Sequence, residues 1–170
     1  PLGAGRPLSP IPMAGPFFPI APARWRCYPS AGMFEVREKP EVVERALLVR
    51  IYCDPREEQE SASLLEELSE LVSTLGIGIV DSVLVRTREQ HKRFICGTGK
   101  ATELCDLAHA HECDVIVFDN MLAPSQQRAW EKEANICVID REEVILDIFA
   151  KRAQTREARL QVELARMQYA

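Results

Sequence analysis

Short apolar runs alternate with helical stretches along most of the chain. The first run, RALLVRIY at Arg45–Tyr52, is rich in β-branched and apolar residues and predicts a strand. The following SASLLEELSELVSTLG repeats its apolar residues at helical spacing and predicts an amphipathic helix. Ser63 and Glu66 fit a capping box at its start, and Gly76 fits a stop at its end.

The same alternation continues for two further helices and three strands. Strands are predicted at Ile77–Arg86, Asp114–Asp119 and Ile136–Asp140, and helices over KATELCDLAHAHE and over PSQQRAWEKEA, which opens with Pro124. The strands are apolar throughout instead of alternating, which is typical of parallel strands covered on both faces. The sequence therefore predicts an α/β fold: a small parallel β-sheet of about four strands in the order βαβαβαβ, flanked by helices.

From Asp140 to Ala170 the chain contains neither glycine nor proline. With Asp140 as the cap, this stretch predicts one unbroken helix of about 45 Å. Its first turns are apolar and should dock on the sheet, whereas Leu160, Leu164 and Met167 form a later apolar seam. We expect that seam to pack against an antiparallel helix that the chain does not supply, so that the long helix would begin a two-helix arm.

Composition divides the chain into three parts. Residues 1–32 hold eight of the eleven prolines, four of the eight glycines and no acidic residue. Such a segment buries too little apolar surface to offset its ordering entropy. We therefore expect a disordered Pro-rich segment at 1–40, an α/β domain at 41–140 and the first arm helix at 141–170. Because the apolar seam lacks a mate, the chain is expected to be a truncated piece of a longer protein. The chain begins with Pro1 and Met33 opens globular sequence, so residues 1–32 are interpreted as a linker, an upstream extension or a mis-called start, with an organellar presequence as the alternative.

Charge, hydropathy and cysteine usage narrow the partners and the compartment that the sequence predicts. A net charge of −5 argues against nucleic-acid binding through bulk charge, although a local basic face remains open. No apolar run reaches the roughly 18 residues that a membrane span needs. The six cysteines show no CxxC pairing, which favours a reduced, cytoplasmic protein with buried thiols.

The GTGK sequence at Gly97–Lys100 precedes a predicted helix and is a candidate phosphate site. It lacks the first glycine and the final Ser or Thr of a Walker A loop, because Phe94 and Ala101 stand at those positions. The backbone N–H groups of Thr98 and Gly99, beside Lys100, could still hold an anion at a helix start. The alternative is that both glycines serve a tight turn and close helix packing.

Other candidate chemistry is weaker. Cys105, His109, His111 and Cys113 do not converge on one helix face as a zinc site requires, so buried thiols and surface histidines are favoured and no metal is expected. Asp119 and Asn120 end the third predicted strand, where ligands of open α/β sheets usually bind, although Asn120 could instead simply shape the turn. No catalytic constellation is present.

The predicted long helix carries an arginine stripe. Arg152, Arg156, Arg159 and Arg166 fall within an arc of roughly 80° on an unbroken helix and could contact RNA phosphates. Glu163 lies in the same arc and weakens the field. Solvated arginines, or arginines paired with acids of a partner helix, are the alternative.

The stretch from Phe118 to Tyr169 closely resembles HflX proteins, a family of ribosome-associated GTPases. FICGTGKATEL and RALLVRI also resemble that family, and the resemblance extends over about residues 44–170. Ala123 departs from it, since the family usually has serine before the proline.

The resemblance implies an amino-terminal α/β subdomain, a two-helix arm and then a GTPase domain that uses GTP and Mg²⁺. It further implies binding to the large ribosomal subunit and its rRNA, in ribosome splitting or rescue under stress. The second arm helix and the GTPase domain would then be missing from this sequence. ATP binding by the α/β domain and an inactive truncated gene product are the other hypotheses.

Overall fold

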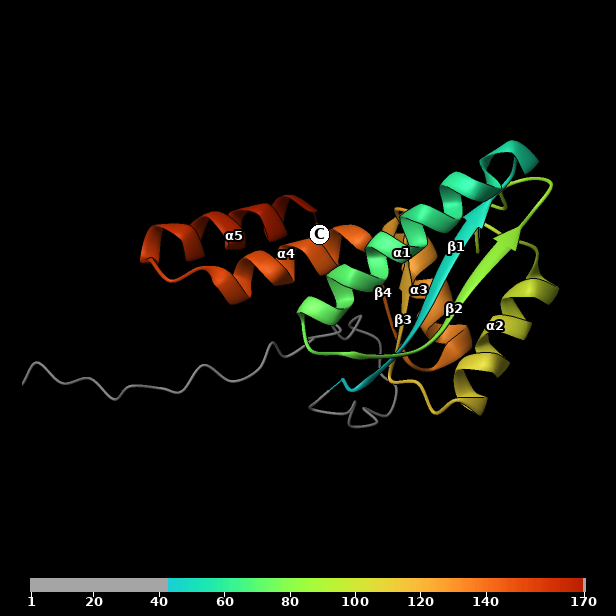
Figure 1. Ribbon diagram of the computed structural model, residues 1–170, viewed down its shortest axis with the longest axis horizontal. Helices are drawn as coiled ribbons and strands as arrows, with labels where there is room; N and C mark the ends of the chain where they lie inside the picture. The colour runs from blue at the N-terminus through green and yellow to red at the C-terminus, as the bar shows by residue number, and fades with distance from the viewer. Residues whose placement is uncertain (1–42, 170) are drawn as a thin grey trace, which may run out of the picture.

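The computed structural model describes residues 43–169, so the Pro-rich segment expected at residues 1–40 lies outside the described residues. At its centre is a sheet of four parallel strands in the order β2-β1-β3-β4 (Figure 1). The strands are β1 (Arg45–Tyr52), β2 (Gly78–Arg86), β3 (Val115–Phe118) and β4 (Cys137–Asp140). The predicted α/β fold with its parallel sheet is confirmed.

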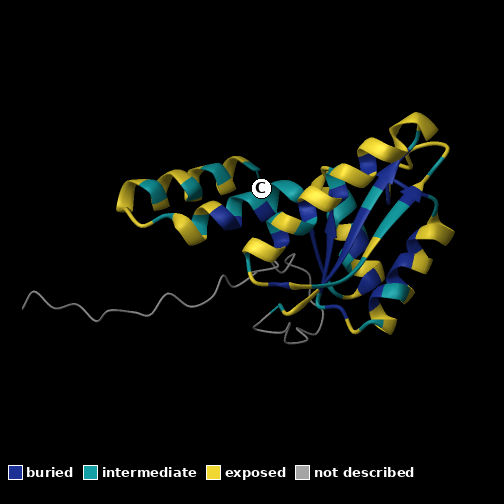
Figure 2. Ribbon diagram, in the orientation of Figure 1, coloured by how far each residue is buried: buried dark blue, intermediate teal, exposed yellow. Residues whose placement is uncertain are grey.

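Helices cover both faces of the sheet, as near-continuously apolar strands require. They are α1 (Glu58–Thr74), α2 (Thr98–Ala110), α3 (Pro124–Ala134), α4 (Arg141–Arg152) and α5 (Arg156–Tyr169), with a 3-10 turn η1 at Pro55–Glu57. The residues of α1 and α4 join one buried cluster, and those of α2 and α3 join the other. In Figure 2 the residues of β1, β3 and β4 are mostly buried, those of the edge strand β2 are mostly intermediate, and the outer helix faces are exposed.

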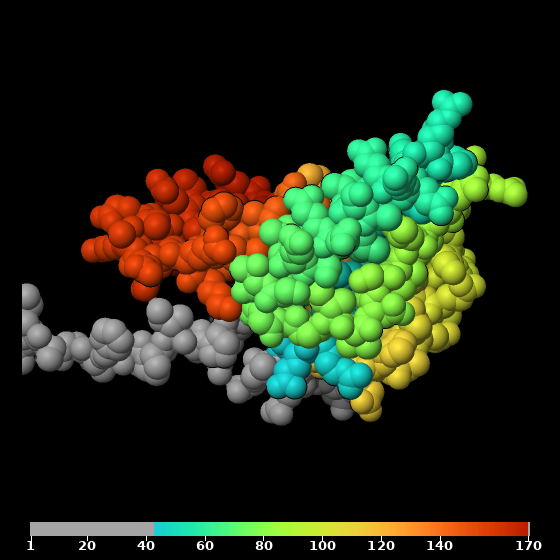
Figure 3. Space-filling view, in the orientation of Figure 1, coloured from blue at the N-terminus to red at the C-terminus, as the bar shows by residue number. Residues whose placement is uncertain are grey.

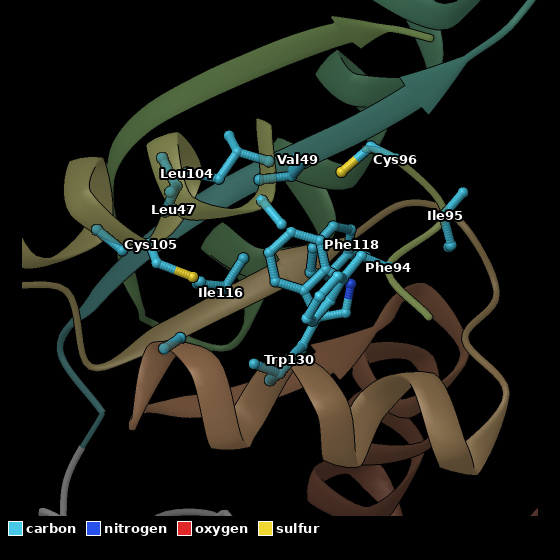
Figure 4. Close-up of a cluster of buried hydrophobic side chains, with 14 of the residues drawn as sticks. Leu47, Val49, Phe94, Ile95, Cys96, Leu104, Cys105, Ile116, Phe118 and Trp130 are labelled. Carbon is cyan, nitrogen blue, oxygen red and sulfur yellow. The ribbon is translucent and has the colours of Figure 1, made fainter. Parts of the chain in front are cut away.

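Three aromatic rings anchor the segment that leads into α2. Phe94, in the loop after β2, lies edge-on to Trp130 of α3 with 5.2 Å between ring centroids. Trp130 in turn lies 4.8 Å from Phe118 of β3 (Figure 4). Because all three rings are buried, this cluster holds the loop on the sheet just before the GTGK sequence.

The start of α1 differs from the prediction. The helix begins at Glu58, so Ser63 lies within it and does not cap it. The start signal is instead Asp54, whose Oδ1 accepts a hydrogen bond from the Arg56 N–H at 2.9 Å, with Pro55 in the first turn of η1. The capping-box interpretation was wrong because an Asp-Pro pair a few residues earlier offered the better N-terminus.

The single helix expected from Asp140 to Ala170 is also wrong. At Ala153 the backbone is extended, with ψ 102°, and α4 ends. Thr155 then caps α5, since its Oγ1 accepts the Ala158 N–H at 3.1 Å. The prediction relied on the absence of glycine and proline, yet a threonine that competes for backbone N–H groups can begin a new helix.

The two helices form an antiparallel hairpin that projects from the sheet domain (Figures 1 and 3). The half-buried residues of α5 recur on the side that meets α4: Ala158, Val162, Ala165 and Tyr169. Roughly 200° away, at about 100° per residue, lie the side chains of the predicted seam. Leu160, Leu164 and Met167 are 56%, 57% and 75% exposed, so the seam is uncovered within residues 43–169.

None of the helices within residues 43–169 is both long enough and apolar enough to cross a membrane.

Candidate functional site

The carboxyl ends of the four strands meet at one edge, and several predicted site residues lie there. Asp119 and Asn120 directly follow β3, and α2 starts at the same edge with the GTGK sequence. The chain leaves β1 in one direction to form β2 and passes to the other side to form β3. The β1–β3 boundary is therefore the switch point at which open α/β sheets usually bind ligands.

Asn120 occupies that switch point with its own side chain. Its Oδ1 accepts the Ile51 N–H at 2.7 Å, and its Nδ2 donates to the Ile51 carbonyl at 2.8 Å. Both polar ends of the amide are thus used to extend the contact between β1 and β3. This geometry favours the turn-shaping interpretation of Asn120 over ligand binding.

Asp119 is the centre of a charged network beside it. The carboxylate is 1% exposed and pairs with Arg50 of β1 and, at 2.9 Å, with Arg141 of α4. Arg141 also contacts Glu67 of α1 at 2.6 Å. Burial alone would lower the pKa of Arg141, but the hydrogen bonds to Glu67 and Asp119 raise it overall, so the guanidinium stays charged. The network ties three elements together at the strand ends.

The GTGK sequence lies as predicted at a helix start. Gly97 is the N-cap of α2 and no side chain caps the helix, so the N–H groups of its exposed first turn have no side-chain acceptor. Lys100 lies beside them but pairs with Glu103 at 2.6 Å. A Cβ added at Gly99 would meet nothing within 4 Å, and one at Gly97 only His91 Nε2 at 3.9 Å. Packing therefore does not require either glycine.

One residue shortly before this sequence has an unusual backbone conformation. Ile95 has φ 62°, a left-handed conformation that a β-branched residue rarely adopts. It is held there by two backbone hydrogen bonds with His91, at 2.9 and 3.0 Å. A strained, buried residue thus fixes the path of the chain into Gly97.

The cysteines and histidines of α2 do not converge. Cys105 and Cys113 are buried in the core, and burial raises the pKa of the Cys105 thiol to about 11. His109 is exposed on the outer face of α2. A protonated, buried thiol is a poor metal ligand, so this arrangement supports surface histidines and structural cysteines.

A row of acids on α4 was missed from the sequence. Asp140, Glu143 and Asp147 lie along one side of α4, and α5 brings Arg166 to Asp147 and the Tyr169 hydroxyl to Asp140. Burial, followed by the charges of Asp140 and Asp147, raises the pKa of Glu143 from its ordinary value of 4.5 to about 7. The signal was the i, i+3, i+7 spacing of the acids, which is informative only once α5 folds back on them.

The break between α4 and α5 redistributes the predicted arginine stripe. Arg166 pairs with Asp147 near the sheet, which gives it a structural contact. Arg152, Arg156 and Arg159 instead gather around the turn at Ala153–Thr155, at the tip of the hairpin that points away from the sheet (Figure 1). All three are exposed, and Arg159 Nε donates to the Ala153 carbonyl at 3.3 Å.

Comparison with solved structures bears on the fold. A GTP-binding protein from Sulfolobus solfataricus in complex with GDP has a TM-score of 0.51 and 20% identity, over 75% of this chain and 37% of that chain. The SsGBP and GDP complex has a TM-score of 0.53 and 21% identity, over 75% of this chain and 35% of that chain. At these identities the similarity shows a shared fold.

Comparison of sequences bears on the family. The family model described as GTP-binding GTPase N-terminal matches residues 62–150. GTPase HflX of Akkermansia muciniphila is 64% identical over 137 residues, which are 81% of this chain and 31% of that protein. GTPase HflX of Escherichia coli is 38% identical over 126 residues, or 74% of this chain and 29% of that protein. The chain thus spans about 30% of the length of these relatives, and it belongs to the HflX family through its GTP-binding GTPase N-terminal domain.

Proposed function

We propose that the chain is a binding module that contacts ribosomal RNA of the large subunit through the tip of its α4–α5 hairpin, in a cytoplasmic ribosome-splitting or rescue factor. The observation that supports this most is the gathering of Arg152, Arg156 and Arg159 at an exposed, projecting turn. Lys151 and Glu157 flank them, so the tip keeps a net positive charge on a chain of net charge −5. Phosphate contacts of this kind position a protein on RNA.

GTP hydrolysis is assigned to another part of the full-length relatives. They are named GTPases, whereas the GTGK sequence here lacks the leading glycine and the Ser or Thr that a Walker A loop uses for phosphate and Mg²⁺. In this proposal the chain binds, and a GTPase domain on the same polypeptide, with GTP and Mg²⁺, controls release.

The uncovered seam of α5 supports a second arm helix. Leu160, Leu164 and Met167 project on the side opposite to α4. An apolar stripe at i, i+4, i+7 is the surface that an antiparallel helix covers. We propose that this helix follows in the full-length protein and extends the hairpin into the predicted arm.

The test of RNA contact is charge reversal at the hairpin tip. The Arg152→Glu, Arg156→Glu, Arg159→Glu variant should lose at least about tenfold in affinity for purified large ribosomal subunits in a co-sedimentation assay. Arg128→Glu is the matched control, because Arg128 is an exposed arginine of α3 far along the chain from the tip. Equal binding by the triple variant and the wild-type chain would contradict the proposal.

Nucleotide binding at the start of α2 is the second candidate function. It is favoured by the open first-turn N–H groups and by glycines that packing does not require. A thermal-shift titration with ATP and with GTP tests it. A rise in Tm that Lys100→Ala abolishes and Lys92→Ala retains would establish this function, and no rise at millimolar nucleotide would eliminate it.

A further inference from the structure

Helix α5 packs mainly against α4 and has little contact with the other elements of residues 43–169. None of its residues is buried, and a shallow groove of about 390 Å³ separates parts of α4 and α5, lined by Glu142, Ile145, Leu146, Ala165, Gln168 and Tyr169. Its preceding link, Ala153–Thr155, is outside both helices. A helix with so little buried apolar surface is expected to open locally at low free-energy cost.

Two polar contacts nevertheless join α5 to two buried acids, Asp147 of α4 and Asp140 at the end of β4. The Arg166 guanidinium donates to Asp147, whose side chain is 7% exposed, while the arginine is 48% exposed. The Tyr169 hydroxyl donates to Asp140, which is 2% exposed. Detaching α5 therefore removes the cation from a buried carboxylate, and that penalty favours the docked position.

Asp140 connects this docking to a different part of the molecule. Its Oδ1 accepts the Glu143 N–H at 3.1 Å and caps α4. Its Oδ2 accepts the Leu122 N–H, also at 3.1 Å, as well as the Tyr169 hydroxyl. Leu122 lies in the loop between β3 and α3, two residues after Asn120 at the switch point. One carboxylate thus joins α5, α4 and the strand-end loop.

We propose that α5 is a two-position latch that pivots at Ala153–Thr155 and is closed by the Arg166–Asp147 and Tyr169–Asp140 contacts. Asp140 transmits the position of the latch to the Met121–Ala123 loop at the carboxyl end of the sheet. In the closed position Asp140 holds the loop and the helix together, and in the open position the Leu122 N–H loses a fixed acceptor. This device is independent of whether the hairpin tip binds RNA.

Hydrogen exchange measured by mass spectrometry and NMR on the 170-residue chain tests the latch. Arg166→Gln opens one contact without touching Asp140, and Tyr169→Phe opens the other while keeping the ring. Both variants should speed amide exchange in residues 156–169 by about tenfold and at Leu122 by about threefold. The response of Leu122 to Arg166→Gln is decisive, because that change reaches the loop only through α5.

Arg156→Gln is the control, since Arg156 is on the same helix and its side chain makes no hydrogen bond or ion pair within residues 43–169. Its exchange should equal that of the wild-type chain. If Arg166→Gln leaves residues 156–169 as protected as before, the latch does not exist. If it loosens α5 but not Leu122, Asp140 transmits nothing, and an equal effect of Arg156→Gln would mean that helix charge and not the latch is responsible.

Discussion

The side-chain amide of Asn120 pairs with both backbone groups of Ile51, accepting from its N–H at 2.7 Å and donating to its carbonyl at 2.8 Å. This contact replaces the backbone of a longer β3 beside the end of β1. The hydrogen bonding between β1 and β3 is thus extended by the Asn120 side chain, past the last residue of β3. Both backbone groups of Ile51 at the switch point consequently have hydrogen-bond partners.

Asn120→Ala should accordingly destabilise the fold. It leaves the N–H and the carbonyl of Ile51 without their partner, at a cost of about 1 to 3 kcal/mol in the free energy of unfolding. Near neutral pH, Asn120→Asp keeps an acceptor for the Ile51 N–H, but its ionised carboxylate cannot donate to the Ile51 carbonyl, so this variant should also be less stable than the wild type. Urea unfolding gives these values, and an unchanged midpoint for Asn120→Ala would show that the amide has no structural role.

The buried ion pairs of Asp119 should contribute more to the free energy of unfolding than any exposed ion pair of the domain. Asp119→Asn leaves Arg50 and Arg141 facing each other around a neutral, buried amide, which should cost about 2 to 4 kcal/mol of unfolding free energy. Arg45→Gln breaks the exposed pair with Glu112 and should cost less than about 1 kcal/mol. Chemical denaturation of both variants measures the difference, and similar values would refute the buried network.

The sequence predicted helix and strand boundaries best where the signal lies in neighbouring residues of the chain. The β1 bounds and the α3 bounds matched because an apolar run and a Pro-opened helix are local signals. The hairpin was missed because Thr155 lies within a strong run of helix formers. The break is stabilised only when α5 folds back, so that Arg166 contacts Asp147 and Tyr169 contacts Asp140. The GTGK loop was located correctly, but the locking of Asn120 by Ile51 depends on a neighbour 69 positions away.

Glu143 should make the stability of the domain depend on pH. Its pKa is raised by burial, then by Asp140, Asp147 and Glu131, to about 7, while Gln127 partly opposes the rise. Because the folded state holds the proton more tightly than the unfolded state, stability is full below about pH 4.5 and falls as pH rises to about 7. The loss from this group should be about 1 to 3 kcal/mol.

Glu143→Gln replaces the titrating carboxyl with an amide that stays neutral, so it should flatten the decline in stability between the same pH values. The amide oxygen can still accept the hydrogen bond from Gln127. Thermal unfolding of both proteins from pH 4.5 to pH 8 measures it. Glu157→Gln, which alters an exposed acid of α5, should retain the wild-type profile. A parallel decline in the Glu143→Gln variant would assign the pH dependence to other groups.

Thr155 should determine where α5 begins. Thr155→Ala removes the Oγ1 that accepts the Ala158 N–H, so α5 should lose about 1 kcal/mol of local stability and its first turn should fray. Thr155→Ser keeps a hydroxyl and serves as the control. Amide exchange at residues 156–160 reports the change, and a helix that instead became continuous through Ala153 would show that Thr155 imposes the break.

The central claim, that arginines at the tip of the α4–α5 hairpin contact RNA phosphates, is tested most directly by the salt dependence of binding. The affinity of the wild-type chain for purified large ribosomal subunits should fall linearly with salt on logarithmic axes. In the Arg152→Gln, Arg156→Gln, Arg159→Gln variant the magnitude of that slope should be smaller by about two to three. An identical slope for the two proteins, or no binding by the wild-type chain at low salt, would contradict the account.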